Sequence, residues 1–116
     1  MAAAPKRVLD IETVWIRQYA RAYLPHETGF SFSAEMLRRE GVTLIDVRNV
    51  FRKGVVTYAN KLDDPGAIWV VEGEDVDGRQ LRITVIVVSE ILEVRLRKVE
   101  RVVAEVKVQE KPNDAA

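Results

Sequence analysis

The chain changes from helical to strand chemistry between Gly54 and Val55, and this change sets the fold class. Before it, apolar residues recur every three or four positions, behind residues that favour helix starts. After it come β-branched and apolar runs, first at residues 55–58 and later at residues 81–88. A helical half followed by a strand half is typical of an α+β domain. We predict two to three N-terminal helices packed on one face of a three- to four-stranded antiparallel sheet.

The first predicted helix begins near Asp10 and ends before Pro25. Asp10 is a favourable N-cap residue, and the Pro25 ring cannot continue a helix. Arg17 and Arg21 fall on the side away from the apolar face. That apolar face, which we expect to be buried, carries Ile11, Val14, Trp15, Tyr19 and Tyr23.

Two shorter helices are predicted from their caps. Ser33 caps the second helix, with Phe32 packing on Leu37 as a hydrophobic staple, and Gly41 closes it. The third helix runs from a capping box, Thr43 with Asp46, to Gly54. Its predicted buried stripe consists of Leu44, Val47, Val50 and Phe51.

Turn residues separate the predicted strands. Residues 63–66 and 74–78 are predicted turns, and the second, with Asp77-Gly78, indicates a tight hairpin. The apolar run at residues 81–88 is predicted to lie centrally in the sheet, with Ile83, Val85 and Val87 on one face. Large aromatic residues are more often core than ligand-stacking, so Trp15 and Trp69 are predicted core residues.

Residues 91–106 fit two patterns. Leu92, Val94 and Leu96 alternate with charged residues, as in a strand, but Leu92, Leu96 and Val99 also recur at helical spacing. The many valines favour a strand to about Val102, because β-branched side chains lose rotamer freedom in a helix.

The composition of the 116 residues predicts one domain in a reducing compartment. We expect a flexible leader at residues 1–8, an α+β domain at 9–103, and an edge extension and frayed tail at 104–116. Eighteen Lys and Arg balance eighteen Asp and Glu, so no overall field steers the chain to nucleic acid or membrane. The absence of cysteine, of a signal peptide and of a long apolar run predicts a cytoplasmic protein without membrane contact.

Cations gather on the second and third predicted helices, at Arg38, Arg39, Arg48, Arg52 and Lys53. Arg48 and Arg52 are four residues apart and therefore share a helix face. Such a group of cations can hold RNA phosphates or an acidic protein partner. It can equally be a solvated helix face, and the zero net charge favours that alternative.

A second group of cations lies on the predicted strands. Arg79 and Arg82 flank Leu81, and paired strands are predicted to bring them near Arg95 and Arg97 as a basic ridge. Glu93 would lie on the same face and neutralise part of this ridge.

Other candidate sites are weaker. His26, the single histidine, has the right chemistry for an acid or base, but it lies in a predicted loop without a second metal ligand. Glu74, Asp75 and Asp77 offer oxygen ligands, yet a tight hairpin explains Asp77-Gly78 without a cation. No phosphate loop, nucleophile elbow or zinc-protease motif is present, and we predict neither a metal nor a cofactor.

Several stretches between residues 32 and 99 follow one order. Residues 32–43 end in Arg-Arg-Glu-Gly-Val-Thr, Asp46-Val47 and Gly54 follow, and then come Trp-Val-Val-Glu-Gly at 69–73 and Asp-Gly-Arg at 77–79. In this order the segment resembles the small RelE-like toxin superfamily, in particular its BrnT-like and MqsR-like branches and a related family of uncharacterised bacterial proteins. Many relatives carry a histidine at the start of the short helix, where residues 30–34 here read Phe-Ser-Phe-Ser-Ala.

The resemblance implies helices on an antiparallel sheet and, in active relatives, a ribonuclease that relies on basic residues. Because the histidine position is empty here, we expect a degenerate, non-enzymatic module that binds protein or RNA. Arg38, Arg39, Arg79 and Arg82 are the candidates that the resemblance supports. Two alternatives remain: an active messenger-RNA endonuclease neutralised by an antitoxin, and a structural homodimer paired through a sheet edge.

Overall fold

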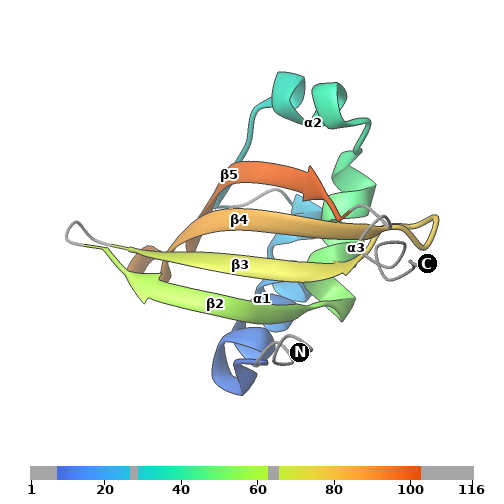
Figure 1. Cartoon of the computed structure of the whole chain (residues 1–116). Helices are drawn as coiled ribbons and strands as arrows, with labels where there is room; N and C mark the ends of the chain where they lie inside the picture. Colours follow the sequence, from blue (N-terminus) through green and yellow to red (C-terminus); the bar gives the residue numbers. More distant parts are fainter. Residues whose placement is uncertain (1–7, 27–28, 63–65, 103–116) are drawn as a thin grey trace, which may run out of the picture.

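The computed structural model describes residues 8–26, 29–62 and 66–102, and it has three α-helices and a five-stranded sheet (Figure 1). Most of the predicted leader and of the turn at 63–66, and all of the tail at 104–116, lie outside the described residues. Three of the elements are helices: α1 (Asp10–Ala22), α2 (Ala34–Glu40) and α3 (Leu44–Lys53). The strands are β1 (Phe30–Ser31), β2 (Val55–Lys61), β3 (Ala67–Glu74), β4 (Gln80–Val88) and β5 (Glu93–Arg101). Two short 3₁₀ helices complete the fold, η1 (Leu24–His26) and η2 (Ser89–Ile91).

The sheet has the order β1-β5-β4-β3-β2 and is mixed, which corrects the predicted antiparallel sheet of three to four strands. Strands β2 to β5 are antiparallel, as predicted, and the structure orders them as a meander. The additional strand β1 pairs in parallel with β5, with Phe30 opposite Val94. A strand of two residues is too short for a periodic signal, and only its distant partner reveals it.

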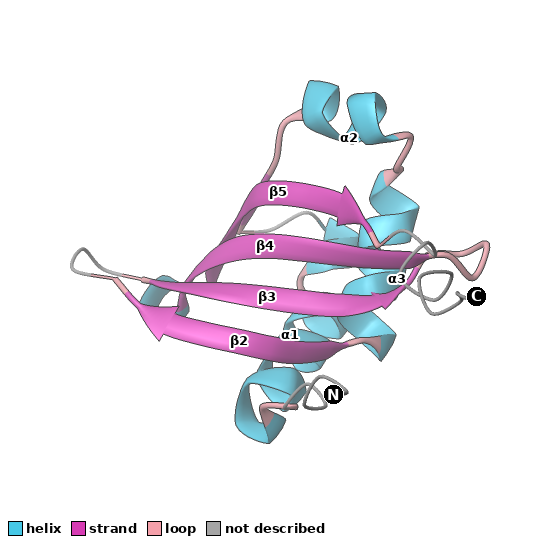
Figure 2. Ribbon diagram, viewed as in Figure 1, coloured by secondary structure: helices cyan, strands magenta, loops and turns pink. Residues whose placement is uncertain are grey.

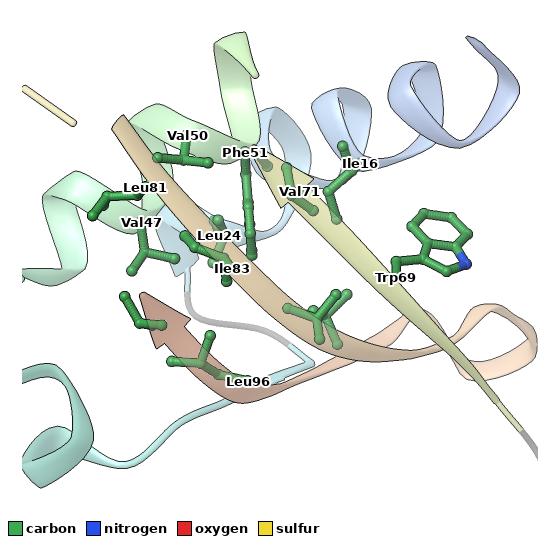
Figure 3. Close-up of a cluster of buried hydrophobic side chains, with 14 of the residues drawn as sticks. Ile16, Leu24, Val47, Val50, Phe51, Trp69, Val71, Leu81, Ile83 and Leu96 are labelled. Carbon is green, nitrogen blue, oxygen red and sulfur yellow. The ribbon is translucent and has the colours of Figure 1, made fainter. Parts of the chain in front are cut away.

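Strand β4 is the middle strand, and its alternation is confirmed. Ile83, Val85 and Val87 are buried on one face of the strand. Figure 3 shows Ile83 among the core side chains between the sheet and the helices. Helices α1 and α3 cover this face, with α3 on β3 and α1 on α3 and β2. The opposite face, turned to the viewer in Figure 2, carries none of the described helices. Trp69 is buried in the core, and Trp15 is partly buried against it, as predicted.

The ambiguous segment is a strand, and an irregularity explains its second pattern. Opposite Thr84 and Val85 the register with β4 shifts, so Arg97 is an extra residue in β5. The buried residues of β5 are therefore Val94, Leu96 and Val99. Leu96 and Val99 are three residues apart, whereas a regular strand buries every second residue. This β-bulge imitates helical spacing in the sequence.

Helix α1 is rotated relative to the prediction. Its N-cap is Leu9, without a side-chain cap, and Asp10 is the first helical residue. Tyr19 is buried and Tyr23 is partly buried, as predicted. Ile11 and Val14, however, are 82% and 54% exposed, and Thr13, Ile16 and Ala20 are buried in their place.

Polar contacts to the start of β2 explain this rotation. Thr13 Oγ1 accepts a hydrogen bond from the amide of Val56 at 2.9 Å. Arg17, predicted to point away, donates to the carbonyl oxygens of Gly54 at 3.0 Å and Lys53 at 3.1 Å. Because buried backbone groups need partners, these bonds favour the Thr13 and Arg17 side over the more apolar side.

The caps of α2 and α3 are confirmed. The Ser33 hydroxyl accepts from the amide of Met36, and Gly41 ends α2 in the left-handed region at φ 67°. Thr43 and Asp46 form the complete capping box of α3. Gly54 ends α3 at φ −81°, and it must be glycine because a side chain would collide with the carbonyl oxygens of Val50 and Glu72.

Candidate binding surface

The hairpin between β3 and β4 holds Arg79 by two carboxylates. Arg79 lies 3.1 Å from Asp75 and 3.2 Å from Asp77. The buried carboxylate of Asp75 also accepts the backbone amides of Asp77 at 2.8 Å and Arg79 at 2.9 Å. These contacts give the acidic turn a structural role, and the described residues hold no group of three or more metal-ligating side chains.

The electrostatics of Asp75 follow from this geometry. Burial alone would raise the pKa of its carboxyl group, but the amides of Arg79 and Asp77 and the charge of Arg79 hold the pKa below its ordinary value of 3.8. Asp75 is therefore ionised at neutral pH and anchors the turn as an anion.

The predicted basic ridge on the sheet does not form. Arg82 stands opposite Glu100 in the register, whereas Arg95 stands opposite Ile86, four residues further along β4. Arg82 lies between two carboxylates, 3.6 Å from Glu72 and 3.7 Å from Glu100. Arg95 lies 2.6 Å from Glu93, as the predicted neutralisation requires. Arg82 and Arg95 therefore each have a carboxylate partner, and they do not combine into one basic patch.

The arginines of helices α2 and α3 differ from those of the sheet in their ionic contacts. Arg38 and Arg39 are exposed in the last turn of α2, where positive charge suits the helix dipole. Arg48 is half-buried and Arg52 is exposed on α3. None of the four forms an ion pair with the described part of the chain. The Nε atom of Arg48 is buried without a hydrogen-bond partner there.

An open apolar hollow of about 500 Å³ lies between α2 and the start of α3. Leu44 on its wall is four residues before Arg48, which is four residues before Arg52, so both arginines lie on the same face of α3 as this wall residue. We call the hollow together with Arg38, Arg39, Arg48 and Arg52 the α2–α3 surface. The hollow is lined by Phe32, Ala34, Leu37, Arg38, Gly41, Val42, Thr43 and Leu44.

Long-range contacts fix this surface in place. Arg101, in β5, donates to the carbonyl oxygens of Glu40 and Gly41, both at 3.1 Å. Asp46 accepts from the amide of Val76 at 3.2 Å, which ties the start of α3 to the β3–β4 hairpin. The predicted staple residues Phe32 and Leu37 both line the hollow, but nothing in the sequence indicated that it stays open.

Three aromatic side chains of α1 and its C-cap form a stacked row, which the sequence did not predict. The rings of Trp15 and Tyr19 stack at 5.5 Å, and those of Tyr19 and Tyr23 at 5.7 Å. Tyr19 donates to the carbonyl oxygen of Gly29 at 3.0 Å. Burial, and next the charge of Glu93, raise the pKa of Tyr19 to about 12, so this phenol stays protonated.

Two further candidates are placed by the structure. His26 is the last residue of η1, and its side chain lies outside what the structure describes. Lys53 lies apart from the hollow, on a cavity of about 530 Å³ at the end of α3 that also includes Glu72, Glu74 and Asp75. The lining has one cation and three carboxylates, so this cavity does not suit an anion such as an RNA phosphate.

Comparisons with known proteins give no relative: no family model, no curated protein and no solved structure matches this chain. The resemblance to RelE-like toxins therefore stays a prediction. None of the described helices has the length and apolar character that a membrane crossing needs.

Proposed function

We propose that this chain is a non-enzymatic binding module whose α2–α3 surface docks an acidic, partly apolar segment of a protein partner. The observation that carries the proposal is the difference in ion pairing between two groups of arginines. Four of them on α2 and α3 lack carboxylate partners among the described residues, whereas Arg79, Arg82 and Arg95 on the sheet are paired. Free guanidinium groups beside an apolar hollow suit a peptide that carries both carboxylates and apolar anchors.

Cleavage of RNA is less well supported than binding. A ribonuclease stabilises the developing charge on phosphorus with several converging cations. Arg79 and Arg82 are held by carboxylates, and Arg82 and Arg95 lie apart along the strands. Among the described residues, the two groups with shifted pKa values are Asp75 and Tyr19, and both pKa values move away from neutrality, which does not suit general acid or base catalysis.

A protein partner is favoured over RNA by the apolar character of the hollow and by the zero net charge of the chain. In the toxin-like family that the sequence resembles, such an acidic segment would belong to an antitoxin. RNA binding at the same arginines is the second candidate, and its affinity would fall steeply with added salt.

Fluorescence anisotropy separates these candidates. One probe is a labelled peptide of alternating glutamate and leucine, and the other is a labelled single-stranded RNA. We expect the peptide to bind and the double variant Arg38→Gln/Arg39→Gln to weaken its binding about tenfold, or about 1.4 kcal/mol. Lys61→Gln/Arg97→Gln removes the same charge elsewhere and should leave the affinity within about twofold. Equal losses in both variants, or tighter binding of RNA than of peptide, would contradict a protein-docking surface.

Expression in bacteria tests the enzymatic alternative. We expect no growth arrest and no RNA fragmentation on induction. RNA cleavage by the purified protein that disappears in Arg79→Ala/Arg82→Ala would establish a nuclease, because contamination cannot depend on these residues. Growth arrest without cleavage would leave the binding proposal in place and indicate a toxin of another kind.

A further inference from the structure

The outward face of α1 is more apolar than a solvated helix needs. Because the polar contacts of Thr13 and Arg17 fix the rotation of the helix, Ile11 and Val14 lie opposite the buried face. Gln18 and Ala22 continue this outward stripe and are exposed. Exposed apolar side chains that the fold does not use mark an interaction site when they are contiguous.

Neighbouring residues extend the apolar stripe. Trp15 is half-buried beside it, and Leu92 from the loop after η2 is 38% exposed. A hollow of about 290 Å³ joins the helix to this loop, lined by Trp15, Gln18, Tyr19, Ala22, Tyr23 and Leu92. Ile91, the neighbour of Leu92, is 62% exposed. The apolar surface therefore belongs to two segments that are far apart in the sequence.

Charges flank the stripe in a self-complementary order. Asp10 lies at the N-terminal end of α1 and Arg21 in its last turn, on the same side as Val14. Both are exposed, and neither forms an ion pair with another described residue. In an antiparallel pair of such helices, Asp10 of one copy comes opposite Arg21 of the other.

The apolar positions obey the same symmetry. A two-fold axis that passes between the two α1 helices at the level of Ile16 brings Ile11 opposite Ala22, and Val14 opposite Gln18, of the second copy. The midpoints of the ionic pair and of both apolar pairs fall within one residue of each other, around this level. An interface in which residue i meets j while j meets i is the mark of a closed two-fold dimer.

We propose that two copies of this chain associate through α1, packed antiparallel about a two-fold axis near Ile16. The contact adds the loop residues Ile91 and Leu92 at its rim. A surface made of one short helix and a loop lies at the low end of interface sizes, so the dimer forms and dissociates readily. This surface shares no residue with the α2–α3 surface, and the inference stands or falls independently of the proposed function.

The sheet edges are less suited to dimerisation than α1. At the start of β2, the amide of Leu9 donates to the carbonyl of Val56 and Thr13 accepts from its amide, so the outer edge is occupied there. At the other side of the sheet, β1 covers β5 at Val94 and Arg95. Pairing of strands between two copies needs free backbone groups, and these contacts shorten both edges.

Sedimentation velocity on the full chain, from about 1 µM to about 1 mM, tests the dimer in the range where small interfaces dissociate. We expect a concentration-dependent monomer–dimer equilibrium. Val14→Glu should raise the dissociation constant at least about tenfold, because it places like charges at the centre of the contact. Ile45→Glu is the matched control, since Ile45 is a similarly exposed apolar residue (61%) on α3, and it should leave the dissociation constant unchanged.

Charge exchange identifies the partner as a second copy in the antiparallel arrangement. Asp10→Arg and Arg21→Asp should each weaken the dimer several-fold, and the double variant should restore an affinity close to that of the original chain. Circular dichroism checks that each variant is folded. A chain that stays monomeric throughout, equal effects of Val14→Glu and Ile45→Glu, or a double variant without restoration would overturn the proposal.

Discussion

Asp75 shows how one buried carboxylate organises a turn. It lies within the acidic segment that suggested a cation site, yet its partners are two backbone amides and the guanidinium of Arg79. Asp77, which contacts the same arginine, has a side chain that is 67% exposed. Substitution of each residue in turn therefore distinguishes the effect of a buried carboxylate from that of an exposed one.

Asp75→Ala should destabilise the fold by about 2 kcal/mol, because it leaves buried amides without their acceptor. Asp77→Ala should change the stability by less than about 1 kcal/mol, as expected for an exposed ion pair. Urea unfolding measures both values. Equal effects would show that the hairpin depends on the ion pairs and not on the buried bonds.

Asp75 also makes the stability of the fold depend on pH. The folded pKa of Asp75 is lower than that of the unfolded chain, so its contribution to stability is complete above the ordinary value of 3.8 and is lost as the pH falls through the folded pKa. We expect Asp75→Asn to remove part of the stability loss that the original chain shows as the pH falls below about 4. Identical slopes of stability against pH would contradict this role.

At the scale of elements, the capping box links α3 to the rest of the molecule. Thr43 and Asp46 satisfy each other's amides at 3.2 and 2.9 Å, and Asp46 also accepts from Val76 in the hairpin. Asp46 is buried, whereas Thr43 is exposed. One residue therefore caps the helix, and the other both caps it and joins two elements.

Thr43→Ala should cost about 1 kcal/mol, the usual loss for such a cap. Asp46→Ala should cost about 2 to 3 kcal/mol, because two donors of Thr43 and the amide of Val76 lose the buried carboxylate that accepts from them. Thermal unfolding of the two variants gives the comparison. A larger loss for Thr43 would mean that the bond to the hairpin contributes little.

The whole molecule depends on one core between the sheet and the helices. Val85 is fully buried in the middle strand β4, on the same face as the core residue Ile83. Thr84, the residue before it, points to the face without helices and is half-buried. Neighbours in one strand therefore face opposite environments.

Val85→Asp should abolish folding into soluble protein, because an unpaired charge in the core costs several kcal/mol. Thr84→Asp makes the same change of charge on the uncovered face, and the variant should remain folded. Solubility after expression and the melting temperature are the measurements. A soluble Val85→Asp variant with an unchanged melting temperature would remove β4 from the centre of the core.

The predicted helix ends were confirmed because their causes lie within a few residues of each end. Ser33, Gly41 and the Thr43–Asp46 box gave the ends of α2 and α3, because each cap acts within four residues. The candidate site was predicted only as a set of arginines. Their sequence positions could not tell Arg38, without an ionic partner among the described residues, from Arg82, which lies between Glu72 and Glu100.

The sequence by itself determined the α+β class, the central strand and the antiparallel direction of β2 to β5, because period and turn chemistry are short-range properties. Only the tertiary structure decided the rotation of α1, the strand β1 and the bulge at Arg97. Each of these depends on contacts between distant positions, such as Thr13 with Val56 across 43 residues. A helix with two candidate faces buries the one whose polar groups complete a neighbour's hydrogen bonds, and the sequence of the helix alone does not contain that neighbour.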